Sequence, residues 1–113
     1  MSFASKDSKH RGWWGYMKWC IRKYDTIEEP RTELERRELE AVDAAIEHTR
    51  SLRDGESRLE LVRLIYWQRS HNVPGAAMAL HVSERTALRW HGDFIKAVAL
   101  AFFGPALTDP PLY

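Results

Sequence analysis

The sequence has little that would stabilise or anchor a protein outside the cytoplasm. Its single cysteine, Cys20, excludes a disulfide within the chain and suits a reducing compartment. No apolar run approaches the ~18 residues that a membrane span requires, and the N-terminal residues lack the apolar centre of a secretory signal. We therefore expect a cytoplasmic protein with no membrane partner.

The residue patterns that mark catalysis, cofactor binding and metal binding are also missing. There is no glycine-rich phosphate loop and no paired-cysteine zinc pattern, and the five histidines are scattered without metal-ligand spacing. Cys20, between Trp19 and Ile21, is typical of a small core residue rather than of a nucleophile. The sequence predicts neither an enzyme nor a bound cofactor or metal.

What the sequence does have is an uneven distribution of charge around a net charge of +1. Lys and Arg outnumber Asp and Glu by six to one in residues 1–24, and by five to three in residues 61–113. In residues 25–60 they are outnumbered by twelve to six. A polyanion such as DNA would therefore meet the two ends of the chain and avoid the middle. Because the C-terminal excess is small, this part alone should bind non-specific DNA weakly.

Composition and hydrophobic periodicity predict an all-α fold, a small helical domain of four to five helices with a C-terminal helix-turn-helix. We expect a single domain over residues 1–113. Residues 1–11 are expected to form a flexible arm, and residues 12–60 to form N-terminal helices suited to dimerisation. The helix-turn-helix region follows over residues 61–103, and an extended tail over residues 104–113. The basic arm could also reach DNA phosphates, but a solvated tail is the simpler interpretation.

The first predicted helix, from Trp13 to Tyr24, carries aromatic and aliphatic residues at helical spacing, including three tryptophans within seven residues. Their large surfaces favour core or subunit contacts over a ligand site. A basic aromatic helix can also lie on a membrane surface. The acidic segment that follows disfavours this alternative, because anionic lipid would repel it.

A longer helix is predicted from Arg31 to Arg53, after a break at Pro30. Its apolar residues form a narrow stripe that would suit pairing with a second copy of the chain, and they are Leu39, Val42, Ile46 and Thr49. Its acidic residues, Glu38 among them, are expected to face solvent.

Two local features of this predicted helix follow from residue spacing. Glu33 and Arg37 are placed for an ion pair one turn apart. Gly55 is expected to take the left-handed conformation that ends the helix. The next helix, from Glu56 to Gln68, is apolar over more than half its circumference and is therefore expected to be central.

Residues Val73–Lys96 are typical of a short helix, a tight turn and a longer helix. Ser83 is expected to cap the longer helix by accepting a hydrogen bond from a backbone N–H near Thr86. His81 occupies the turn, where a positive φ is unusual for any residue but glycine. The inner face should comprise Ala77, Val82, Ala87 and Trp90, and the outer face Glu84, Arg85, Leu88 and Arg89. An inert helical hairpin remains the alternative to a DNA-binding helix-turn-helix.

The stretch from residue 61 to residue 103, LVRLIYWQRSHNVPGAAMALHVSERTALRWHGDFIKAVALAFF, resembles the C-terminal half of the RinA/ArpU-type phage transcriptional regulators. The resemblance is carried by Gly75-Ala76-Ala77, by the run His81–Ala87, and by Arg89-Trp90-His91 with Phe94-Ile95 following. Those regulators have a helix-turn-helix similar to region 4 of sigma-70-like factors. The resemblance implies a small phage or prophage regulator of late or packaging genes, and not a catalyst.

The expected DNA contacts divide by geometry. Arg85 and Arg89 are the best candidates for base edges, since an arginine can bind guanine with two hydrogen bonds. Glu84 could accept a hydrogen bond from cytosine, and Leu88 could contact a thymine methyl group. The residues placed for phosphates, which position a helix without reading sequence, are Ser83, Thr86, His91 and Lys96.

Two further interpretations stay open. The helix pair could be a protein-interaction module that contacts RNA polymerase or the phage packaging machinery. It could also belong to a small terminase-like subunit that recognises phage DNA. For the DNA-binding interpretation we expect a homo-oligomer, most simply a dimer, because two half-sites double the contact area available to so few positive charges.

Overall fold

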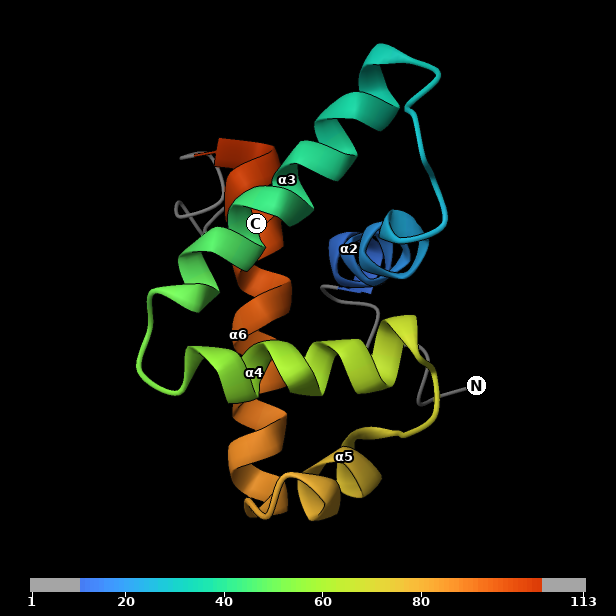
Figure 1. Ribbon diagram of the computed structural model, residues 1–113. Helices are drawn as coiled ribbons and strands as arrows, with labels where there is room; N and C mark the ends of the chain where they lie inside the picture. Colours follow the sequence, from blue (N-terminus) through green and yellow to red (C-terminus); the bar gives the residue numbers. More distant parts are fainter. Residues whose placement is uncertain (1–10, 105–113) are drawn as a thin grey trace.

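The computed structural model describes residues 11–104 and is all-helical over that range (Figure 1). Its elements are α2 (Arg11–Tyr24), α3 (Glu33–Arg50), α4 (Gly55–Val62), the π-helical segment η1 (Arg63–Trp67), α5 (Val73–Ala79) and α6 (Glu84–Phe103). Because η1 continues α4 directly, the fold has five helices, and the predicted all-α class is confirmed. The arm and the tail predicted at the two ends lie outside the described residues, except that Arg11 begins α2 and Gly104 caps α6.

Short polar residues cap the N-terminal ends of α3, α5 and α6. Ser83 accepts a hydrogen bond from the backbone N–H of Thr86 at 3.0 Å, as predicted. Asn72 does the same for the N–H of Gly75 at the start of α5. Thr32 caps α3, so this helix starts two residues later than the sequence analysis predicts. These side chains satisfy N–H groups that have no partner inside the helix.

α6 is the element on which the others pack. Figure 1 shows α3 and α4 crossing in front of α6, with α2 beside them and α5 at the N-terminal end of α6. The main core lies between α2, α3, the C-terminal part of α4 and the second half of α6. Its fully buried side chains include Met17, Ile21, Val42, Ile95 and Val98. Cys20 is buried there too, as expected of a small core residue, and burial raises the pKa of its thiol to about 12.

A second, smaller core holds the start of α6 to α4 and α5. Leu61 and Leu64 of α4 and η1 pack against Ala76 and Ala77 of α5, and against Ala87 and Trp90 of α6. Burial of Trp90, which is 4 % exposed, is therefore confirmed. The alanines leave room for close helix approach, so the first two turns of α6 have a fixed position on the domain.

The inward face of α3 differs from the prediction. Its buried residues are Glu38, Ala41, Val42, Ala45 and Thr49, and the stripe assigned to a second copy is partly used inside the monomer. Arg37 lies over the ring of Phe102 at 4.9 Å, and Glu33 pairs with Arg36 instead, so the predicted Glu33–Arg37 pair is wrong. The buried face of α3 is centred on the small residues Ala41 and Ala45 rather than on the predicted stripe, and these alanines allow α6 to pack close to α3.

Glu38 is 2 % exposed, so its predicted solvent-facing position is also wrong. The hydroxyl of Tyr16 and the ammonium of Lys23, both on α2, donate hydrogen bonds to the two carboxylate oxygens of Glu38. A buried charge is tolerated when it is paired and hydrogen-bonded in this way. The Tyr16–Glu38–Lys23 cluster therefore joins α2 to α3.

Gly55 does not take the left-handed conformation predicted for it. α3 ends at Arg50, Asp54 adopts the positive φ of 62°, and Gly55 is the first residue of α4. A Cβ atom on Gly55 would lie 2.4 Å from the carbonyl oxygen of Thr49 and 2.7 Å from that of Arg50. The glycine is needed for close approach of two backbone segments rather than for its range of φ.

Candidate nucleic-acid interface

The turn between α5 and α6 contains a non-glycine residue with a positive φ. His81 has a φ of 58°, and its N–H donates to the carbonyl oxygen of Met78. The N–H of Val82 donates to the carbonyl oxygen of Ala77 at 3.0 Å. These bonds reverse the chain within four residues and bring Ser83 to the start of α6. The turn therefore sets the position of α6 relative to α5.

All four residues predicted to read bases lie on the outer surface of α6. Glu84, Arg85, Leu88 and Arg89 are exposed, and Leu88 keeps 52 % of its surface accessible. Arg85 and Arg89 are four residues apart, so they lie one above the other with a rise of about 6 Å. Within residues 11–104, neither arginine side chain has a hydrogen bond or an ion pair. Both guanidinium groups are therefore available to an external acceptor.

Ala87 and Trp90 hold the opposite side of the same turns. Ala87 is fully buried, and the guanidinium carbon of Arg58 lies 5.6 Å from the centroid of the Trp90 ring. The outer arginines and the inner core residues thus belong to different faces of one helix. A change on the outer face can alter a contact with a ligand without removing a contact of the core.

The residues assigned to phosphates are not equivalent in the structure. Ser83 is exposed, but its hydroxyl already accepts from the Thr86 N–H and donates to the Thr86 hydroxyl at 3.0 Å. Lys96 is exposed and lies seven residues after Arg89, which places it on the same stripe of α6 about two turns away. Lys96 thus extends the basic row formed by Arg85 and Arg89.

His91 lies against the core rather than toward solvent, and this placement argues against its assigned contact with phosphate. Its ring stacks on Tyr66 with centroids 5.6 Å apart, and its Nε2 lies 2.7 Å from the Tyr66 hydroxyl. Burial and, to a smaller extent, the charge of Lys18 lower the pKa of His91 to about 4. The imidazole is therefore neutral near pH 7 and attracts a phosphate little.

This histidine should make the fold sensitive to acid. An ordinary histidine has a pKa of about 6.5, so between roughly pH 6.5 and 4 the unfolded chain binds a proton at His91 that the folded chain does not. The free energy of unfolding should therefore fall as the pH drops through this window, by up to about 1.4 kcal/mol per pH unit. Urea unfolding across this window measures the slope. His91→Gln should reduce it, and equal slopes for parent and variant would contradict a lowered pKa.

Two basic residues of α2 lie near the middle of α6, around His91, and no pattern in the sequence brings them together there. Lys18 is close enough to His91 to influence its pKa, and the guanidinium of exposed Arg22 lies 5.9 Å from the Tyr66 ring that stacks on His91. A Cβ atom on Gly92 would lie 3.7 Å from the ring of Trp14, so α2 approaches α6 at this point. Residues 66 and 91 are far apart in sequence, and only the fold brings Lys18 and Arg22 beside them.

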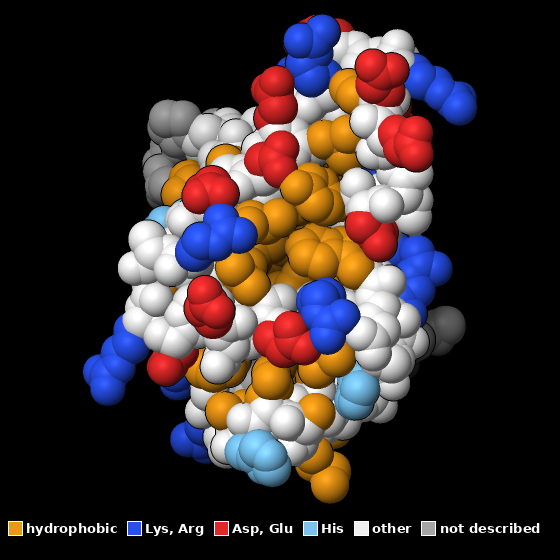
Figure 2. Space-filling view, viewed as in Figure 1, with side chains coloured by type: hydrophobic (Ala, Val, Ile, Leu, Met, Phe, Trp, Pro, Cys, Tyr) orange, Lys and Arg blue, Asp and Glu red, His pale blue; other side chains and the backbone are white. Residues whose placement is uncertain are grey.

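The face formed by α3 and α4 is a poor surface for a polyanion. Figure 2 shows acidic side chains spread across this face, around hydrophobic side chains between the helices. The basic side chains of α3 and α4 are largely paired there, as in the ion pairs Arg50–Glu47 and Arg63–Glu60. This agrees with the acidic balance of residues 25–60 and leaves the outer stripe of α6 as the better surface for DNA.

Other kinds of site have less support in the described residues. Among residues 11–104, no three His, Cys, Asp or Glu side chains come together as metal ligands would, and no helix is long and apolar enough to cross a membrane. Comparisons with models of protein families, with curated proteins and with solved structures return no match to this chain, so its resemblance to the phage regulators stays a prediction from its residues.

Proposed function

We propose that the protein binds double-stranded DNA sequence-specifically, as a cytoplasmic transcriptional regulator of the phage or prophage type. In this proposal α5 and α6 form a helix-turn-helix, and α6 is the recognition helix in the major groove. The observation that carries it is the exposed, unpaired row of Arg85 and Arg89 on a helix whose inner side is fixed by Ala87 and Trp90.

The proposed contacts divide into reading and positioning. Arg85 and Arg89 read base edges, and Glu84 and Leu88 adjust the choice of sequence. Lys96 and the start of α6 at Ser83 and Thr86 contact phosphates, with Lys18 and Arg22 on the flanking helix.

Measuring the affinity for random double-stranded DNA at two salt concentrations tests the electrostatic attraction between the protein and DNA phosphates. A protein that neutralises about three to five phosphates should lose roughly 40- to 500-fold in affinity between about 50 and 200 mM salt. Lys18→Gln should flatten this salt dependence. Arg36→Gln, which removes the same charge from exposed α3, should leave it unaltered. Affinity that does not respond to salt would contradict nucleic-acid binding.

The second candidate is a protein-interaction module that contacts RNA polymerase or packaging proteins, whereas a small terminase-like subunit, which recognises phage DNA, is a variant of the first candidate. The exposed Leu88 and the 77 % exposed Met78 favour it, because apolar side chains at a surface also suit a protein partner. Retention of polymerase from a lysate by a protein that binds no DNA would support this candidate over the first.

A homodimer remains part of the proposal, since two copies would contact two half-sites one DNA turn apart. The predicted stripe of α3 is a poor pairing surface, because two of its four residues, Val42 and Thr49, are buried within one chain. The exposed apolar side chains that remain for pairing include Trp19, Leu34, Leu100 and Phe103. Sedimentation at tens of micromolar should show a dimer, and a monomer at that concentration would contradict it.

A further inference from the structure

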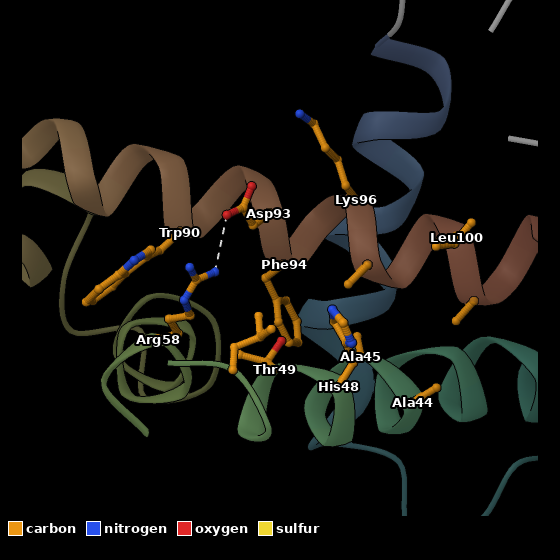
Figure 3. A pocket seen from close by; sticks show the side chains of 13 residues that line it. Ala44, Ala45, His48, Thr49, Arg58, Trp90, Asp93, Phe94, Lys96 and Leu100 are labelled. Carbon is orange, nitrogen blue, oxygen red and sulfur yellow. Dashed lines mark hydrogen bonds and ion pairs between the residues drawn. The ribbon is translucent and has the colours of Figure 1, made fainter. Parts of the chain in front are cut away.

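A pocket of about 510 Å³ lies between α3 and α6 and is closed at one end by α4 (Figure 3). Its volume falls within the range typical of sites for small molecules. Arg85 and Arg89 do not line it, and Lys96 is the residue that it shares with the surface proposed to bind DNA.

One end of this pocket is polar. Arg58 of α4 reaches across to Asp93 of α6, with Nη1 and Oδ2 3.2 Å apart, and its side chain is 17 % exposed. Its Nε lies beneath the surface without a hydrogen-bond partner, the only such buried side-chain nitrogen or oxygen among residues 11–104. A guanidinium carries five N–H donors, and Asp93 occupies one of them. Arg58 is therefore short of acceptors.

The other end of the pocket is mostly apolar, with the ring of His48 as a polar neighbour. Ala44 of α3 and Leu100 of α6 lie at this end, away from the Arg58–Asp93 pair (Figure 3), and Ala97 of α6 also lines the pocket. Along α6 the distance from Asp93 to Leu100 is seven residues, or about 10 Å. Lys96 lies at the edge, and Figure 3 shows its side chain directed away from α3. The pocket thus suits an elongated molecule with one polar end.

We propose that this pocket binds a small amphipathic carboxylate. The carboxylate accepts hydrogen bonds from Arg58 at the polar end, and an unbranched apolar chain of about seven carbons, which matches the length of roughly 10 Å along α6, lies along Ala97 and Leu100. Bonds between a guanidinium and a carboxylate are charge-assisted and stronger than those to a neutral oxygen. An ammonium group would instead meet the positive charge of Arg58, whose one carboxylate partner is already engaged.

Titration of octanoate, octanol and octylamine into the 15N-labelled full chain tests this proposal by NMR. Octanoate should bind saturably with shifts centred on Arg58 and Ala97, and octanol at least about tenfold more weakly. Arg58→Met, which keeps the length of the side chain, should reduce the affinity for octanoate to that for octanol.

Ala97→Phe should fill the apolar end and abolish binding of both molecules. Ala44→Leu at an exposed position provides the same test if Ala97→Phe does not fold. Equal affinity for octanoate and octanol, shifts that map elsewhere, or no saturable shift up to about 10 mM would each overturn the proposal. Arg85→Ala/Arg89→Ala should bind octanoate like the parent, so failure of the DNA proposal leaves this result intact.

Discussion

Arg85→Ala/Arg89→Ala should weaken binding to a cognate DNA site by roughly 1–3 kcal/mol for each arginine and relax the sequence preference. Both side chains are exposed on α6 and have no partner within the described residues. The melting temperature should therefore stay nearly unaltered, since surface substitutions of this kind usually change the free energy of unfolding by less than about 0.5 kcal/mol. Selection of sites from a random DNA pool, followed by anisotropy with the selected site, measures both effects.

Two control variants separate loss of recognition from loss of fold or of general attraction. Lys96→Ala should weaken all DNA sequences alike, because a phosphate contact reads no base. Trp90→Ala should cost about 3–5 kcal/mol of stability, because it empties a buried site between α4 and α6. If the double variant binds the selected site as tightly as the parent, α6 is not the recognition helix. The helix pair would then belong to a protein partner.

The parts of this structure that depend on neighbouring residues could be predicted from the sequence. Ser83 caps α6 through a residue three positions away, and Trp90 follows Ala87 on the same face at helical spacing. The outer positions of Arg85 and Arg89 follow from the same periodicity. The DNA role of these residues needs a ligand to establish and stays a proposal.

The parts that depend on distant residues could not be predicted. Glu38 lies in a run of acidic residues, a pattern that predicts a solvent-exposed helix face. Its partners Tyr16 and Lys23 belong to another helix and are 22 and 15 residues away in the sequence. His91 lies two residues after exposed Arg89, and the ring that stacks on it belongs to Tyr66, 25 residues away in η1. Hydrophobic periodicity predicts the buried face of a single helix from its own residues. These errors arise where contacts with a second helix bury a different face.

Glu38→Leu should destabilise the fold strongly, by about 3 kcal/mol, at the low end of the cost of breaking a buried ion pair. The substitution leaves the ammonium of Lys23, which is 14 % exposed, and the hydroxyl of Tyr16 without their acceptor. Glu35 lies 3.9 Å from the same ammonium and recovers part of the loss. Thermal unfolding by circular dichroism should show a fall in Tm above about 10 °C.

The double variant Glu38→Leu/Lys23→Met distinguishes a lost charge partner from a general packing defect. Replacing a buried ion pair by apolar residues of similar volume is often neutral or stabilising, whereas removing one member leaves the other buried and uncompensated. The double variant should therefore be more stable than Glu38→Leu alone, although it has one more substitution in the interface between α2 and α3. Additive losses in the two single variants and the double variant would show that the pair does not couple the helices. In that case Tyr16 and the packing of Met17 and Ile21 would account for the attachment of α2.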